Sequence, residues 1–435
     1  GRLRRAGKRS AVSVPLDDDG LPPGGPWTAA SAQVLGAGRM LARGGRAVAG
    51  SRAARSVTFA GLAAAVVAGA AARRRVRPGS GRTAELAEPG EGSLPEPGDD
   101  DLVPLVGGEP TTVVASDGVP LHVEVVGDPG AALTLVFIHG FCVSLDFWTF
   151  QRRELAECGR LVFYDQRAHG LSGASDVAAC TIEQLGDDLY QVLAEVVPTG
   201  PVILVGHSMG GMTILALADA HAELFGGRIV GVGLVSTSAG SLATVTFGLP
   251  VAATKMLRTA LPGLAVGMRY APTLLERGRR HGSQVAWAAT RRIGFGSAAV
   301  GPPLVSFLEK MVAATPLHVM AAFLPALINH DKIAAAAALV TTPTLILVGD
   351  ADVMTPLEHS RTLSELLPEA DLVVLAGAGH AVTLERPNEV NEALRALVNR
   401  ATARPRGLPR PPGARTQAAP ARHDRGPEDL RTRTS

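Results

Sequence analysis

The hexapeptide GHSMGG, from Gly206 to Gly211, constrains the fold of this chain more than any other stretch. Four consecutive large apolar residues precede it at 202–205, a pattern that predicts a strand buried on both faces of a parallel sheet. The mostly apolar residues 212–218 that follow can continue as a helix. A serine at the centre of G-x-S-x-G, between a strand and a helix, is typical of a nucleophile elbow.

In such an elbow, Ser208 is expected to have a strained backbone conformation, with its hydroxyl pointing out of the sheet. Gly206 and Gly210 flank it because a side chain at either position would push the strand and the helix apart. The same pattern also arises by chance, as a loop that contains a serine, in a chain with 50 glycines. The flanking strand and helix patterns favour the elbow over the chance loop.

A serine hydroxyl is a poor nucleophile at neutral pH and needs an adjacent base that a third group orients. His380 is the candidate base, because it follows the apolar run 372–375 at the C-terminal edge of a predicted strand. Asp350 and Asp352 follow the preceding strand, and N-capping of the next helix is the alternative role for both. We assign Asp352 as the acid because it lies further into the loop, whereas Asp350 can brace the turn. The chain order Ser, Asp, His is that of hydrolases with this architecture.

Two backbone amides are needed to stabilise the negative charge that develops on a carbonyl oxygen during acyl transfer. One is the amide of Met209, directly after the serine. The other is expected in the loop after the predicted strand 133–138, where His139 and Gly140 lead into Phe141. We nominate the amide of Phe141, whose side chain would then line an acyl pocket.

Four further histidines and a cysteine call for assignment. His139 and His207 flank the predicted site, and for both a structural hydrogen-bonding role is favoured over proton transfer. The same interpretation applies to His169 and His330. Cys142, beside the predicted oxyanion loop, is expected to be a small buried residue rather than a reactive thiol.

The fold class predicted for residues 111–400 is α/β, because predicted strands alternate with predicted helices. This alternation implies a mostly parallel central sheet with helices on both faces. It stops at about 238–338, which is predicted to be helical. An insertion there, between the sixth strand and the acid-bearing strand, would cover the elbow as a cap.

The two ends of the chain differ in composition from this body. Residues 1–55 are basic and rich in Gly, Pro and Ala, and no fold is predicted for them. Because the first residue is Gly1 and not Met, two interpretations of 1–39 stay open: an over-extended gene start, with Met40 as the alternative start, or a fragment. Residues 77–110 are predicted to be a Pro, Gly and acid-rich linker, and residues 401–435 a disordered Pro/Arg-rich tail.

The Ala-rich hydrophobic segment 56–76 contains an uncharged run at 57–72 between arginines. A helix that spans a membrane needs about 20 apolar residues, so this run is short. Arginine on both sides gives no orientation. Three interpretations stay open: a marginal membrane anchor, a helix packed on or beside the body, and disorder. The expected localisation is therefore cytoplasmic or membrane-associated.

The charge distribution and the motifs of the sequence limit which classes of partner and cofactor the chain is expected to bind. Residues 1–82 carry 15 Lys and Arg against 3 acidic residues, and 401–435 carry 8 against 3, so the segment between them has a net charge of −15. A nucleic-acid-binding domain would carry positive charge on its folded face, so we expect no nucleic acid. The basic ends can bind an anionic surface. The sequence has neither the residue spacing of a metal site nor a glycine-rich phosphate-binding loop, so we expect no metal and no cofactor. The sequence does not predict the oligomeric state.

In its motifs the chain resembles the α/β-hydrolase fold superfamily and is similar to actinobacterial α/β hydrolases of unassigned substrate. The resemblance covers about residues 111–400 and implies Ser208 as nucleophile, Asp352 as acid and His380 as base. Ala168 departs from the Gly that many relatives have in this structural loop. The matching pieces are HGF at 139–141, DQRAHGLS at 165–172, GHSMGG at 206–211, GDADVMTP at 349–356 and GAGHAVTLERP at 377–387.

The residue type at the elbow limits the types of reaction that the chain is expected to catalyse. Epoxide hydrolases and haloalkane dehalogenases of this superfamily use an aspartate there, so a serine implies acyl transfer through an acyl-enzyme. We expect a carboxylesterase- or lipase-like serine hydrolase acting on a hydrophobic small molecule or lipid. The alternatives are a cofactor-free haloperoxidase or perhydrolase, an acyltransferase, and a non-catalytic binding protein on this fold. Apolar cap residues that favour such a substrate are Leu257, Leu261, Met268, Tyr270, Trp287, Phe295, Phe307 and Phe323.

Overall fold

The computed structural model describes most of the predicted α/β body and little else. The basic N-terminal extension, the candidate membrane anchor and the tail beyond residue 403 lie outside the described residues, as does part of the predicted cap. The described ranges are 83–84, 102, 108–245 and 283–403.

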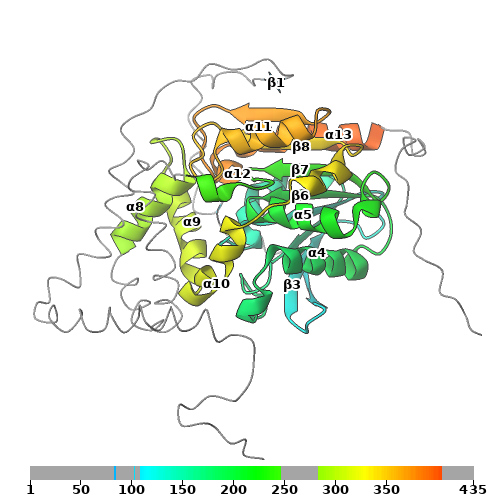
Figure 1. Ribbon diagram of the computed structural model, residues 1–435, viewed down its shortest axis with the longest axis horizontal. Coiled ribbons are helices and arrows are strands. Elements are labelled where there is room, and N and C mark those ends of the chain that lie inside the picture. Colours follow the sequence, from blue (N-terminus) through cyan, green and yellow to red (C-terminus); the bar gives the residue numbers. More distant parts are fainter. Residues whose placement is uncertain (1–82, 85–101, 103–107, 246–282, 404–435) are drawn as a thin grey trace, which may run out of the picture. The chain divides into compact units, whose positions relative to one another are not determined.

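A nine-stranded sheet forms the centre of the molecule (Figure 1), with the order β1-β9-β8-β7-β6-β4-β5-β3-β2. Every neighbouring pair is parallel except the two that β3 makes, with β2 and with β5. The mostly parallel sheet predicted from the sequence is therefore present. The strands are β1 Thr83–Ala84, β2 Glu109–Val114, β3 Pro120–Val126, β4 Thr134–Ile138, β5 Arg160–Tyr164, β6 Val202–His207, β7 Ile229–Val235, β8 Thr344–Gly349 and β9 Asp371–Leu375.

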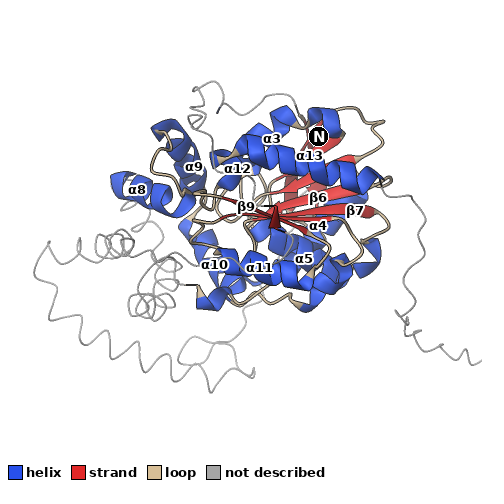
Figure 2. Cartoon of the chain, turned by 90° about the horizontal axis from the view of Figure 1, so that it is seen from above, coloured by secondary structure: helices blue, strands red, loops and turns tan. Residues whose placement is uncertain are grey.

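Helices cover both faces of the sheet (Figure 2), which is why every residue of β4, β6 and β8 is buried. Large apolar residues fill these strands, as expected where both faces are covered. One face packs against α4 Ile182–Val196, α5 Met209–Ala220 and α11 Leu357–Leu366, and the other against α3 Thr149–Glu154 and α13 Pro387–Ala403. Short turns complete the body: η3 Leu145–Trp148, η4 Ala156–Cys158, η5 Val177–Ala179, η6 Ala222–Leu224 and α12 Val382–Glu385.

Between β7 and β8 the chain forms a helical insertion, the described part of the predicted cap. Its helices α9 and α10 are bent by 92° relative to each other. Among the described helices, none is by itself long and apolar enough to cross a membrane, and α9 with α10 meets that test only as a bent pair. The insertion comprises η7 Leu242–Thr244, α8 Ser283–Gly294, α9 Pro302–Ala314, α10 Leu317–Ile328 and η8 Ala334–Leu339.

The structure differs from the predicted domain boundaries at both ends of the body. Within the expected linker 77–110, the backbone of Thr83–Ala84 pairs with the open edge of β9, and β2 already begins at Glu109. Leu102, also within that range, is buried in an apolar cluster. At the C-terminus, α13 extends to Ala403, past the predicted limit of the body at 400, and Ala401 packs in the apolar cluster on the sheet.

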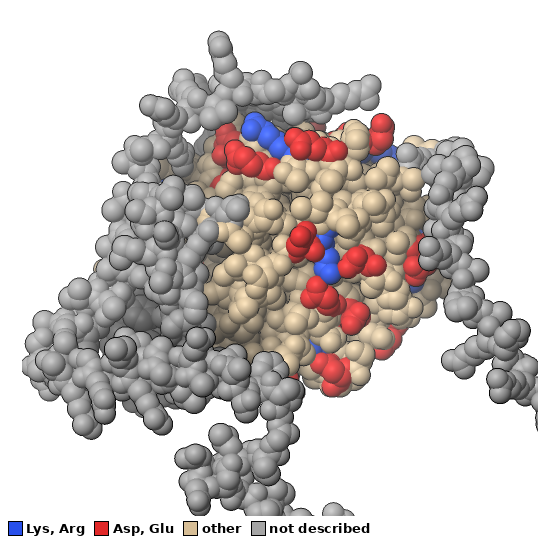
Figure 3. Space-filling model, viewed as in Figure 1, with Lys and Arg blue, Asp and Glu red and all other residues tan. Residues whose placement is uncertain are grey.

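On the face that carries α4, α5 and α11, most side chains are uncharged, and the charged ones are mostly acidic (Figure 3). This matches the acidic character of the body deduced from the sequence.

Candidate functional site

Ser208 lies in the sharp turn between β6 and α5, with φ 52° and ψ −115°. A positive φ is strained for a residue with a side chain, and it persists only where the surroundings enforce it. Two glycines do so. A Cβ on Gly206 would lie 2.5 Å from the carbonyl of Gly210, and one on Gly210 would lie 2.1 Å from the carbonyl oxygen of Ile138. The strained turn and the need for glycine on both sides agree with the sequence prediction.

The structure brings His380 and Asp352 together. His380 follows β9, and its Nδ1 lies 2.8 Å from Oδ2 of Asp352, in the loop after β8. Asp352 also accepts hydrogen bonds from the amides of Met354 and Thr355, at 2.8 and 2.9 Å, and from Thr355 Oγ1 at 2.8 Å. Burial alone would raise the pKa of Asp352, but the His380 imidazole and the Thr355 hydrogen bonds outweigh it and lower the pKa. Asp352 is thus held as a carboxylate.

Asp350, the alternative acid, is exposed and lies away from this pair. Its Oδ1 accepts a hydrogen bond from the amide of Gly377, at 2.6 Å. Gly377 has φ 71° and turns the chain between β9 and His380. Asp350 therefore braces the loop that carries His380, the role that the sequence offered for it.

His207 connects the elbow with the loop of His380. Its Nε2 donates to the backbone oxygen of His380 at 2.9 Å, and the two rings have centroids 4.8 Å apart. Burial, with a smaller contribution from His380, lowers the pKa of His207 to about 3, so the ring stays neutral. No hydrogen bond of Ser208 Oγ is found among the described residues, but His207 places the His380 loop directly beside the elbow.

The two predicted oxyanion-hole amides flank Ser208. A Cβ on Gly140 would lie 3.2 Å from Cβ of Ser208 and 2.7 Å from Nδ1 of His207, so the Gly140–Phe141 loop lies against the elbow. The amide of Met209 begins α5, where backbone donors have no partner within the helix. Among the described residues, neither this amide nor that of Phe141 has an acceptor.

His139 fixes the loop that carries Phe141. Its Nδ1 donates to the oxygen of Gly140 at 2.7 Å, and its Nε2 accepts from the amide of Gln166 at 2.9 Å. The Gln166 side chain donates to the oxygen of His139 and accepts from Thr213 Oγ1 on α5, both at 2.7 Å. Burial lowers the pKa of His139 to about 4, so the ring is neutral and structural, as expected.

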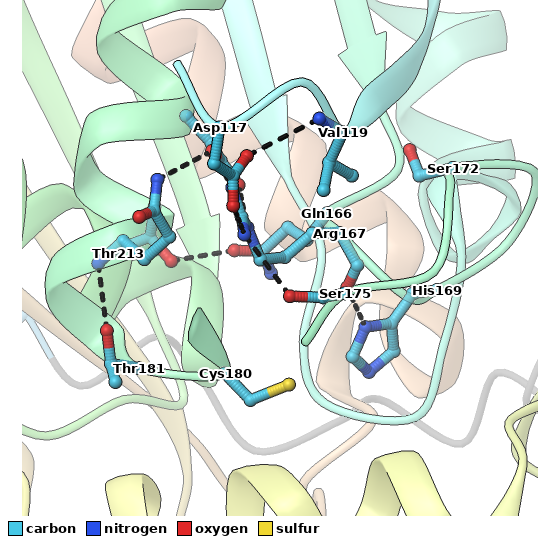
Figure 4. A network of polar contacts seen from close by, with 12 residues as sticks. Asp117, Val119, Gln166, Arg167, His169, Ser172, Ser175, Cys180, Thr181 and Thr213 are labelled. Carbon is cyan, nitrogen blue, oxygen red and sulfur yellow. Dashed lines mark hydrogen bonds and ion pairs between the residues drawn. The ribbon is translucent and has the colours of Figure 1, made fainter. Parts of the chain in front are cut away.

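Arg167, itself fully buried, forms an ion-pair network next to this loop (Figure 4). Its guanidinium contacts both carboxylate oxygens of Asp188 on α4, at 2.6 and 2.7 Å, and both of Asp117, at 2.7 and 3.0 Å. Nη1 also donates to Ser175 Oγ at 3.2 Å. The network joins the β2–β3 turn, the loop after β5 and α4. Nothing in the sequence predicts this network, although Arg167 lies in the DQRAHGLS motif.

An aromatic cluster connects the helical insertion with the site. Phe323 on α10 is fully buried, and its ring centroid lies 6.4 Å from that of Phe141 and 5.5 Å from that of His169. Burial lowers the pKa of His169 to about 3, so it too is neutral. Of the other apolar residues named for the cap, Phe295 is buried; Leu257, Leu261, Met268 and Tyr270 lie outside the described residues.

The remaining candidates have structural surroundings. His330 Nε2 donates to the oxygen of Ser238 at 3.1 Å, and burial lowers the pKa of His330 to about 4. Cys142 is buried and has φ 62°. In the part of the chain that the structure describes, no three His, Cys, Asp or Glu side chains lie close enough to hold a metal ion.

A model of the alpha/beta hydrolase family matches residues 135–393, which contain Ser208, Asp352 and His380. The chain belongs to this family. A solved esterase from Exiguobacterium antarcticum is similar in fold, with a TM-score of 0.55 and 23% identity over 67% of this chain and 100% of that one.

Two proteins named as candidate carbamate hydrolases, both RutD, are similar in sequence. The one from Yersinia enterocolitica is 26% identical over 63% of this chain and 90% of its own length. The one from Variovorax paradoxus is 38% identical over 23% of this chain and 37% of its own length. The chain is thus a hydrolase by family.

Proposed function

We propose that this protein is a serine hydrolase that cleaves a carboxylic ester, or a related acyl bond, of a hydrophobic small molecule or lipid. The observation that carries the proposal is the His380–Asp352 contact beside the strained elbow of Ser208. A buried, ionised carboxylate keeps a proton on Nδ1 of the imidazole and so leaves Nε2 as the base.

In the proposed mechanism, Ser208 Oγ attacks the acyl carbon and its proton passes to Nε2 of His380. The negative charge on the carbonyl oxygen is stabilised by the amides of Phe141 and Met209. Collapse of this intermediate breaks the bond to the leaving group, which takes the proton from His380. Water then attacks the acyl-enzyme with the same proton transfers, and releases the acid and free Ser208.

The substrate class follows from the apolar surroundings. Phe141 lies between the proposed oxyanion hole and Phe323 of the helical insertion, so an acyl or alkyl group bound there would contact aromatic carbon. Apolar pockets with a few polar groups are typical of small-molecule sites. If residues 57–72 associate with a membrane, a lipid-like ester would suit both features. Hydrolysis of monoacylglycerols no faster than of acetate esters would contradict the lipid proposal.

The first test is labelling of the full chain with a fluorophosphonate probe, with Ser208→Ala as the matched control. We expect labelling that disappears in the variant, because only an activated serine reacts. A panel of acyl esters of graded length then defines the acyl group, and a carbamate belongs in the panel because of the RutD proteins. A folded protein that is not labelled would contradict the proposal and favour a non-catalytic binding protein.

Two other activities use the same groups and differ in what attacks the acyl-enzyme. Hydrogen peroxide in place of water would make the protein a perhydrolase, and an alcohol would make it an acyltransferase. Product analysis with each nucleophile in competition with water distinguishes them.

A further inference from the structure

Glu385 is a buried carboxylate that the proposed mechanism does not use. It ends α12 and is 2% exposed. Its Oε1 accepts a hydrogen bond from the amide of Ser297 at 2.7 Å. Its Oε2 accepts from the amides of Gly296 and Gly379, at 3.0 and 2.7 Å. Three backbone donors therefore converge on one side chain.

These donors belong to two distant segments of the chain. Gly296 and Ser297 follow α8 in the helical insertion, whereas Gly379 directly precedes His380. The segments also bond to each other, since the amide of Ala381 donates to the oxygen of Gly294 at 2.7 Å. In Figures 1 and 2, α12 accordingly lies beside α8 and α9. Glu385 bridges the insertion and the loop of His380.

The two backbones touch with no side chain between them. A Cβ on Gly296 would lie 2.3 Å from the oxygen of Gly377, and a Cβ on Gly379 would lie 2.4 Å from the amide nitrogen of Gly296. Because the contact is between backbone atoms, it cannot be adjusted by a change of rotamer. Movement of either segment would therefore move the other or break the contact.

Burial makes this carboxylate costly, and burial raises the pKa of Glu385 although the three amides favour the charged form. Its donors come from both segments, so separating them would leave the buried charge without part of its hydrogen bonds. A buried charge that loses partners is strongly destabilised. The carboxylate consequently favours the arrangement in which both segments are in place.

We propose that Glu385 is a positioning residue that couples the seating of the helical insertion to the orientation of His380. When the insertion lifts from the sheet edge, Gly296 and Ser297 leave the carboxylate, and its hold on Gly379 weakens. His380 is then in place for proton transfer only when the insertion is seated over the site. This inference rests on the proposed function for the role of His380 alone; the coupling itself is a property of the fold.

The coupling is tested first in the unaltered full chain by native-state amide hydrogen exchange. If the two segments open together, the amides of Gly296, Ser297 and Gly379 should show equal free energies of opening. Rapid exchange at Gly296 and Ser297 with continued protection at Gly379 would overturn the proposal. This measurement does not depend on activity, so it remains decisive if the serine is not labelled and the proposed function fails.

The effect on His380 is tested with Glu385→Gln, which keeps the size of the side chain but turns one oxygen into an NH₂ group that faces backbone donors. We expect exchange at all three amides to accelerate. The rate of fluorophosphonate labelling at Ser208 should fall by about 100-fold, the loss associated with a misplacement of about 1 Å. Gly296→Ala, which disturbs the same contact from the insertion side, should lower labelling as well.

The matched control is Asn391→Ala on α13. It removes a buried hydrogen bond that Asn391 accepts from Gln151 at 3.0 Å, in the same C-terminal segment but away from the insertion and the His380 loop. In this control, we expect the exchange rates of the Gly296, Ser297 and Gly379 amides to stay close to those of the unaltered protein. The rate of labelling at Ser208 should also stay close to that of the unaltered protein. An equal loss of labelling in the control and in Glu385→Gln would show that Glu385 contributes only to global stability, and would overturn the positioning role.

Discussion

Replacing Asp352 by Asn should lower the rate of the proposed acylation step strongly without unfolding the protein. Asp352 Oδ1 accepts from the amides of Met354 and Thr355, so in the variant the side-chain NH₂ group would take the place of Oδ2. There it would donate to Nδ1 of His380 and leave the ring proton on Nε2. An imidazole in that tautomer cannot accept the proton of Ser208.

The magnitude follows from the distance between the two charged groups. When His380 takes up a proton, its Nδ1 lies 2.8 Å from Oδ2 of Asp352. At an effective dielectric constant of about 20, opposite unit charges at this separation attract each other by about 6 kcal/mol. Since about 1.4 kcal/mol corresponds to a factor of ten in rate, the loss should be about 10⁴-fold, similar to that seen when a triad aspartate is replaced by Asn.

The assay is the second-order rate constant for fluorophosphonate labelling, compared among the unaltered protein, Asp352→Asn and Asp350→Asn. Asp350→Asn is the matched control, because an amide oxygen can still accept the hydrogen bond from Gly377. Equal losses in the two variants, or a loss below about tenfold in Asp352→Asn, would refute the assignment of the acid.

Three further predictions concern stability and substrate range. Burial lowers the pKa values of His139 and His207 to about 4 and about 3 from 6.5. Between these values and 6.5, the unfolded chain therefore binds more protons than the folded chain. The free energy of unfolding should rise with pH from about 4 to 6.5 and then level off. Urea midpoints that stay constant over this range would contradict it. Arg167→Ala should lower the free energy of unfolding by about 3–5 kcal/mol, because Asp188 stays buried without its partner; a urea titration that finds an unchanged midpoint would show otherwise. Phe323→Leu should raise KM for long-acyl esters more than for acetate esters. Equal changes in KM for the two classes of ester would contradict a contact between Phe323 and the acyl group.

The turn at Ser208 and the place of His380 beside Asp352 could be predicted because their signals are local. A run of apolar residues, a turn and a helix fix the place of Ser208, and His380 follows a strand that the same rules identify. The choice of Asp352 over Asp350 required only that one residue lie further into the loop. Parallel strands then bring these loops to one edge of the sheet.

Contacts between distant polar residues could not be predicted in this way. Gln166 joins His139 to Thr213 only because β4, β5 and α5 meet there, and a single sequence does not contain that register. The three donors to Glu385 are backbone amides, and the type of a residue does not predict which acceptor its amide will bind. Leu102 belongs to an apolar cluster although its neighbours in sequence have the composition of a linker.

The contact between Gly210 and the carbonyl of Ile138 has an evolutionary consequence. It presses the start of α5 against the end of β4, and the amides of Met209 and Phe141 extend from these two elements. The distance between the two proposed donor amides is thereby fixed by a contact between backbone atoms, with no side chain between them. Substitutions in the helical insertion can therefore change the apolar surroundings of Phe141 while the spacing of the two amides stays the same. If the proposed function holds, new substrates can be acquired in this chain without a change to the two proposed donors.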